Sequence, residues 1–164
     1  MPINEPAIIP VNCPIPSELV SMMEDYKSIV NHLINSGLHH EIGLEKHYYP
    51  LAATDTTGKP KSIPPERELR DLNKKWFTEH YKGKYAAHYL DSASSFAMQQ
   101  IQSWRTLGGD ITSTPHHRKL IARLNNDLYT IQESKPNGTM RIRITTAPHQ
   151  FSDNGYKSKP PAFQ

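Results

Sequence analysis

The spacing of apolar residues changes once along this chain of 164 residues, and that change limits the folds open to it. Before the pair Gly108-Gly109, apolar residues recur every three or four positions, as on one face of a helix. After the pair, they alternate with polar residues, as in strands that are half buried in a sheet. Helices followed by strands predict an α+β fold, with a bundle of about three helices and a small antiparallel sheet.

The helical spacing predicts three helices. The first has Ser17 as its N-cap and ends at Gly37, and the second begins at Pro64-Pro65, which suit an opening turn, and stops near Gly83. The third runs from there to the glycine pair, and alanines on its apolar face would let a neighbouring helix approach closely. The residues expected to face the core are Leu19, Met22, Met23, Tyr26, Ile29, Val30, Leu33 and Ile34 in the first helix, Leu69, Leu72, Trp76 and either Phe77 or His80 in the second, and Ala86, Leu90, Ala93, Ala97, Ile101 and Trp104 in the third.

Three short strands joined by two hairpin turns are expected after the glycine pair, at residues 121–124, 128–131 and 139–145. In the last of them, the arginines and the isoleucines would point to opposite faces of the sheet. Residues 7–11 are apolar enough for a further strand, which its proline would confine to an edge of the sheet.

These patterns divide the chain into four parts. Residues 1–16 form a proline-rich segment, residues 17–114 a helical region, residues 115–147 a small sheet region, and residues 148–164 a polar tail without regular structure. Residues 38–64 within the helical region are expected to be an irregular, exposed segment.

Charge is distributed unevenly, although the net charge is only +3. Residues 1–60 have a net charge of −4 and residues 115–164 a net charge of +5, which is the distribution expected of a surface that binds a polyanion. The sequence has no apolar run long enough to cross a membrane and no secretory signal. Its single cysteine, Cys13, can form neither an internal disulfide nor a zinc ribbon, so the predicted compartment is the reducing cytoplasm.

Positive side chains close to aromatic rings predict contacts with nucleic acid, because guanidinium and ammonium groups bind phosphates and rings stack on bases. Arg141 and Arg143 lie two positions apart on one strand face, which suits neighbouring phosphates. An ordinary solvated surface is the alternative interpretation, with Tyr129 in the core. The predicted nucleic-acid-binding residues are Arg118, Lys119, Arg123, Tyr129, Arg141 and Arg143 in the sheet region, and Lys74, Lys75, Lys84 and Arg105 in the helical region.

No catalytic residue, metal ligand or cofactor is predicted. The nine histidines include adjacent pairs but no pair at the i, i+4 spacing that helical metal sites use. No phosphate-binding glycine loop and no nucleophile motif is present. Two alternatives stay open: a helical domain that binds proteins, suggested by the alanine-bearing third helix, and a small metal-dependent hydrolase that uses the histidines.

Several short stretches resemble the N-terminal part of TnpB, also called OrfB, the RNA-guided endonucleases of insertion sequences. The similarity extends over roughly residues 7–147. The stretches that carry it are Ala7-Ile8-Ile9-Pro10-Val11, Glu24-Asp25-Tyr26 with Val30-Asn31, Ser103-Trp104-Arg105, and above all residues 118–131 and 138–144.

The resemblance implies a strand-rich domain with a helical insertion that holds a guide RNA and the guide-target duplex. In the family, a following nuclease domain carries three acidic residues and a zinc ribbon. This sequence includes neither, so the expectation is a non-catalytic module that binds RNA and DNA, with a missing C-terminal nuclease domain as a candidate partner. Whether it is a remnant, an independent short protein or a fragment of a longer one is left open by the residues.

Overall fold

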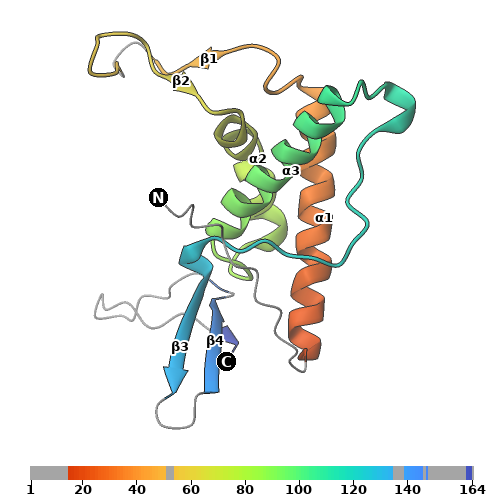
Figure 1. Cartoon of the computed structure of the whole chain (residues 1–164), viewed down its shortest axis with the longest axis vertical. Helices are drawn as coiled ribbons and strands as arrows, with labels where there is room; N and C mark the ends of the chain where they lie inside the picture. The colour runs from red at the N-terminus through yellow and green to blue at the C-terminus, as the bar shows by residue number, and fades with distance from the viewer. Residues whose placement is uncertain (1–14, 51–53, 135–138, 146, 148–161, 164) are drawn as a thin grey trace, which may run out of the picture.

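The computed structural model describes residues 15–50, 54–134, 139–145, 147 and 162–163. Three helices form one body, and the β3–β4 hairpin extends from one end of it (Figure 1). The α+β class predicted from the spacing of apolar residues is confirmed. The strand predicted at residues 7–11 lies outside the described residues.

The helices are α1 (Ser17–His39), α2 (Pro65–Tyr81) and α3 (His88–Thr106), and α3 packs against both of the others. Pro16 occupies the N-cap position of α1, so Ser17 is its first helical residue and not the predicted cap. Gly37 was predicted to end α1, but it is buried within the helix. A Cβ atom at that position would lie 2.6 Å from Ile101 Cδ1, so the missing side chain allows α3 to approach α1.

The core lies where the three apolar faces meet. Leu33, Ala93 and Ala97 are completely buried, and α3, which carries the two alanines, packs against both neighbouring helices. The predicted face of α2 is wrong at Leu72, which is 47% exposed. Asn73 is buried in its place, because its side-chain amide donates to Ser36 Oγ at 2.9 Å and to the Leu69 carbonyl at 2.8 Å.

Two small antiparallel sheets complete the fold. In the first, β1 (His47–Tyr48) pairs with β2 (Ser62–Ile63) within the segment predicted to be irregular. In the second, β3 (Tyr129–Ser134), β4 (Thr139–Thr145) and β5 (Ala162–Phe163) follow one another in the order β3-β4-β5. The predicted hairpin that joins the last two strands is therefore confirmed, whereas the tail, predicted to lack regular structure, contributes β5.

The other predicted hairpin is wrong. Residues 121–125 form no strand, and the predicted turn is replaced by the 3₁₀ helix η2 (Asn126–Leu128). Ala122 and Leu124 pack against the helical core instead, and Leu128 is completely buried. Alternating apolar residues predicted a strand there, but the surface that buries them belongs to helices, so the segment has no strand to pair with.

Among the described residues, no helix combines the length and the apolar character that crossing a membrane would require.

Candidate nucleic-acid interface

Residues 116–124, which we call the arch, cross the helical body as an extended segment on the way from the 3₁₀ helix η1 (Ile111–Ser113) to η2 (Figure 1). Asn31 of α1 fixes the start of the arch. Its side-chain Nδ2 donates to the His117 carbonyl at 3.0 Å, and the His117 amide donates to Asn31 Oδ1 at 2.7 Å. The two bonds satisfy both backbone groups of His117 and hold it against α1.

A second polar contact fixes the arch near its end. The hydroxyl of Ser92, a buried residue of α3, donates to the Arg123 carbonyl and accepts a hydrogen bond from the Tyr26 hydroxyl of α1 at 3.1 Å. Burial raises the pKa of Tyr26, so the phenol keeps its proton at neutral pH. Both α1 and α3 therefore set the position of Arg123.

Between these two attachments, the arch and α3 enclose a shallow hollow of about 380 Å³, which we call the arch groove. Its lining contains basic, polar and apolar side chains and no carboxylate. The lining residues are Phe96, Gln100, His116, His117, Arg118, Lys119, Ile121 and Arg123.

Three of these cations were predicted as nucleic-acid-binding residues, and the structure places them together. Arg118, Lys119 and Arg123 are all exposed, and none of the ion pairs found among the described residues involves them. The Arg123 guanidinium lies over the Phe96 ring, 4.5 Å from its centroid, and its Nη1 donates to Gln99 Oε1 at 2.5 Å. The groove can therefore offer positive charge to an anion without first breaking an ion pair.

His117 contributes to the electrostatics of the groove from a buried position. Only 6% of it is exposed, and its ring meets the Phe96 ring edge-on at 4.9 Å. Burial lowers the pKa of His117, the hydrogen bond to the Ile121 carbonyl opposes that shift, and the positive charges of Lys27, His116 and Lys119 lower it further. The ring is therefore neutral at pH 7, in a region of positive potential.

The predicted cations of the helical region lie outside the groove. Lys84 Nζ lies 2.6 Å from Asp25 Oδ2, which also accepts from the Tyr85 hydroxyl at 2.5 Å, so a phosphate would have to compete with this ion pair. Arg105, in the last turn of α3, donates at 2.6 Å to the carbonyl of Ile42, which follows α1. Lys74 and Lys75 are exposed on α2, where Lys75 lies 3.9 Å from Glu79.

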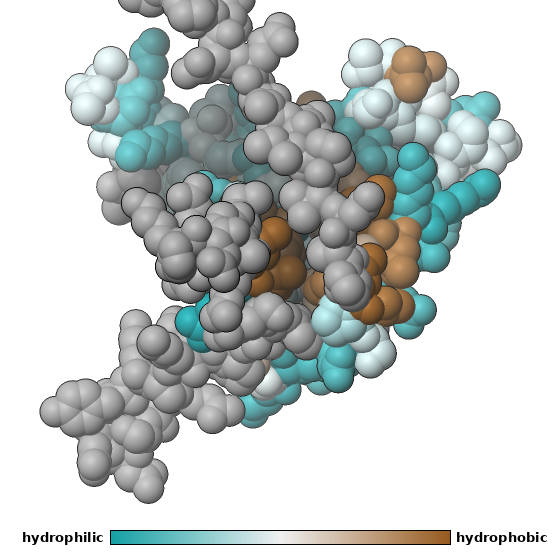
Figure 2. Space-filling view, turned by 60° about the horizontal axis from the view of Figure 1, so that its bottom comes forward, coloured by the Kyte–Doolittle hydropathy of each residue, from teal (hydrophilic) through white to brown (hydrophobic). Residues whose placement is uncertain are grey.

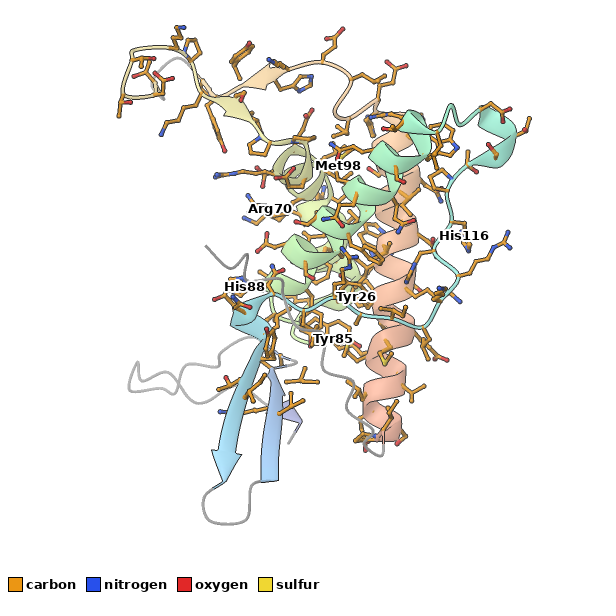
Figure 3. The ribbon with its side chains drawn as sticks, viewed as in Figure 1. Tyr26, Arg70, Tyr85, His88, Met98 and His116 are labelled. Atoms are coloured by element: carbon orange, nitrogen blue, oxygen red, sulfur yellow. The ribbon has the colours of Figure 1, made fainter. Side chains whose placement is uncertain are left out.

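The predicted residues of the sheet also lie apart from the arch groove. Arg141 and Arg143 share one face of β4, opposite Gln132 and Thr130 of β3, and Arg143 is half-buried. The side chain of Arg141 lies outside the described part of the chain. Tyr129 is half-buried, and its hydroxyl donates to Asn126 Oδ1 at 3.2 Å. His116 of the arch and His88, close to the start of the hairpin, lie on opposite sides of the helical body (Figure 3).

Sequence reasoning missed the residues that build the groove around its cations. His116 and His117 were considered only as metal ligands, and Phe96 was assigned no role. Asn31 and Ser92, which hold the arch, left one signal in the sequence: each is a small polar residue directly beside an apolar core position. Nothing in the sequence says that their partner is a backbone group 86 or 31 positions away.

The histidines do not assemble into a metal site: among the described residues, no three His, Cys, Asp or Glu side chains are grouped so that they could hold an ion. His32 instead stacks on Trp76, with 3.5 Å between the ring centroids, and its Nε2 lies 3.0 Å from Asn73 Oδ1. Because both protons of the Asn73 amide are donated elsewhere, its oxygen faces His32 and accepts from Nε2.

No curated protein and no solved structure matches the chain. A family model does match, over residues 22–145, which include all three helices nearly in full, the arch and the β3–β4 hairpin. On the strength of that match, the chain belongs to the Uncharacterized protein MJ0013 family.

Proposed function

We propose that this chain binds nucleic acid through the arch groove, mainly by contacts to phosphates, and that it catalyses no reaction itself. RNA and DNA are both candidate partners. The observation that carries the proposal is the grouping of Arg118, Lys119 and Arg123 around one hollow that no carboxylate lines.

The arrangement of side chains along the arch supports this function. Ala122 and Leu124 pack against the core, whereas Lys119, Ile121 and Arg123 line the groove, so the extended segment turns alternate residues outward. Same-face residues of an extended segment are separated by roughly 6.6 Å, so Lys119 and Arg123, which flank Ile121, are roughly 13 Å apart and can contact separate phosphates of one strand. Each phosphate that is neutralised releases condensed counterions, so affinity must fall as the salt concentration rises.

A salt titration tests the proposal. Binding of labelled RNA and DNA oligonucleotides to the full chain is measured by fluorescence anisotropy between about 50 and 200 mM salt. The variant Arg118→Gln/Lys119→Gln should bind at least about tenfold more weakly at low salt, and its slope of log K against log salt should be shallower by nearly two. The matched control is Lys74→Gln/Lys75→Gln, which removes the same charge from the exposed face of α2 and should change affinity about twofold or less.

The proposal fails if the unchanged protein binds neither RNA nor DNA at low salt. It also fails if the two double variants lose affinity equally, because net charge and not the groove would then explain binding.

The TnpB-like origin, the absence of catalysis and the cytoplasmic compartment belong to the same proposal and rest on the sequence. The absence of catalysis has a direct test. Labelled RNA and DNA incubated with the chain and a divalent metal should remain intact on a denaturing gel, and cleavage that copurifies with the chain would overturn this part of the proposal.

A domain that binds other proteins is the second candidate, and one observation favours it. Ile131 of β3 and Ile142 of β4 face each other across the hairpin and are 55% and 39% exposed. Figure 2, in which this end is turned forward, also shows apolar surface next to hydrophilic surface. Light scattering distinguishes the candidates, because a stable oligomer that binds no nucleic acid would support the second and contradict the first.

A further inference from the structure

The geometry of Arg123 points to a narrower ligand class, an inference that rests on the proposed function. We infer that the arch groove takes a single strand, and that the Arg123 guanidinium is the platform on which one unpaired base stacks.

The first step concerns the contacts of the guanidinium group. Its central carbon lies 4.5 Å from the centroid of the Phe96 ring, and Phe96, which is only 7% exposed, also meets the His117 ring. The ring therefore cannot receive a base itself. Arg123 is exposed and lines the groove, so a base in the groove can reach its guanidinium group. Guanidinium planes and aromatic rings are the surfaces on which proteins stack unpaired bases.

The second step concerns how firmly the platform is held. Gln99 accepts a hydrogen bond from Arg123 Nη1 at 2.5 Å. The Ser92 hydroxyl donates to the Arg123 carbonyl and so holds the backbone in place as well. Side chain and backbone are thus both fixed before a ligand arrives. A group that is already ordered loses little conformational entropy on binding, so stacking on it can contribute fully to affinity.

The third step concerns size. A hollow of about 380 Å³ is comparable to a small-molecule pocket and can receive one or two nucleotides. A duplex keeps its bases stacked inside a wide cylinder, so it could offer the groove only phosphates and the edges of bases. Ile121 lies between the cations in the groove lining and gives a base or sugar an apolar contact that a phosphate cannot use. A single strand can therefore contact more of the side chains that line the groove than a duplex can.

The experiment compares three probes of about 12 nucleotides, a length within the range that small single-strand-binding domains cover. They are an oligothymidylate, a strand of the same length and charge in which every nucleotide is abasic, and a blunt duplex. The unchanged protein should bind the oligothymidylate roughly 5- to 160-fold more tightly than the abasic strand, since one stacked base contributes that much. When affinities are compared per phosphate, the duplex should bind no more tightly than the abasic strand.

The variant Arg123→Lys keeps the charge and removes the plane, so its preference for the oligothymidylate over the abasic strand should shrink towards one. The matched control is Arg118→Lys, which should leave that preference unchanged, and a thermal melt establishes that both variants are folded. The comparison of probes on the unchanged protein does not depend on either variant.

The outcomes distinguish the proposed function from the single-strand inference. If no probe binds, the proposed function itself is overturned. If all three probes bind equally, or if the duplex binds best, the single-strand inference is overturned while phosphate binding stands. A preference for the oligothymidylate that survives in Arg123→Lys overturns the assignment of the stacking platform to Arg123.

Discussion

The arch and the β3–β4 hairpin were both predicted to contain strands and nucleic-acid-binding cations, but they differ in how they are held. Each contains two or more cations, and in the arch the predicted strand covered residues 121–124. The hairpin is ordered by its own ladder, in which β3 pairs with β4 along six residue pairs. The arch has no strand partner among the described residues, and side chains of α1 and α3 hold its backbone instead.

This difference determines what each set of cations can do. On the hairpin, the arginines occupy alternate positions of β4, opposite Gln132 and Thr130 of β3. On the arch, the backbone follows the surface of the helices, so its side chains and those of α3 line a common hollow. A concave group of cations focuses positive potential more strongly than the same charges on a flat strand.

The largest expected effect comes from releasing the arch. Asn31→Ala removes both hydrogen bonds to His117 and should lower the free energy of unfolding by about 2 kcal/mol, as expected for two bonds to partly buried groups. It should also weaken nucleic-acid binding several-fold, although Asn31 carries no charge. Urea denaturation and anisotropy titrations measure the two effects.

The matched control for that variant is Asn35→Ala, which removes an exposed asparagine from the same helix and should change neither quantity appreciably. If Asn31→Ala loses stability but binds as before, the conformation of the arch does not matter for binding, and the comparison with the hairpin loses its basis.

A smaller effect is expected from the hairpin. Arg141→Gln/Arg143→Gln should reduce affinity about twofold or less and should leave the single-strand preference unchanged, because the hairpin cations lie outside the groove and act only through net charge. The same anisotropy assay measures this at low salt. A loss as large as that of Arg118→Gln/Lys119→Gln would mean that hairpin and arch bind one continuous ligand.

The smallest effect concerns pH, to which the arch responds through its buried histidine, His117. Burial lowers the pKa of His117 below its ordinary value of 6.5, so the unfolded chain takes up a proton before the folded chain does. The stability contributed by the neutral ring is therefore complete above pH 6.5 and is lost as the pH falls through the lowered pKa. Urea midpoints measured at successive pH values should show this decline.

His117→Gln should make that decline shallower, because glutamine can still donate to the Ile121 carbonyl but does not titrate. The decline should not vanish, since burial also lowers the pKa of His32. An unchanged profile in this variant would show that His117 is not a source of the pH dependence.

Much of the fold could be predicted from the sequence because its signals are local. Helical spacing and proline placed α2 and α3 to within a few residues, and alternation with an Asn-Gly turn predicted the β3–β4 hairpin. The predictions were wrong where the same sequence pattern allowed more than one packing arrangement. Leu72 and Asn73 could each have faced the core, and hydrogen bonds to Ser36 and Leu69 selected the asparagine.

The candidate site was predictable only in part. The sequence drew attention to Arg118, Lys119 and Arg123 by their charge, but it also pointed to Lys84 and Arg105. The first of these is paired with Asp25, which is 59 positions away, and the second with a backbone carbonyl 63 positions away. Such pairings depend on which helices meet, and no local pattern records that.

By itself, the sequence determined the α+β class, the three helices and the strand-like character of residues 121–124, because propensity and hydrophobic spacing act over neighbouring positions. Only the tertiary structure decided that those residues would lie on helices, and so which cations would meet in one groove. The physical reason is that an extended segment must satisfy its backbone and bury its apolar side chains, and here Asn31, Ser92 and the helical core do both where a second strand would otherwise be needed.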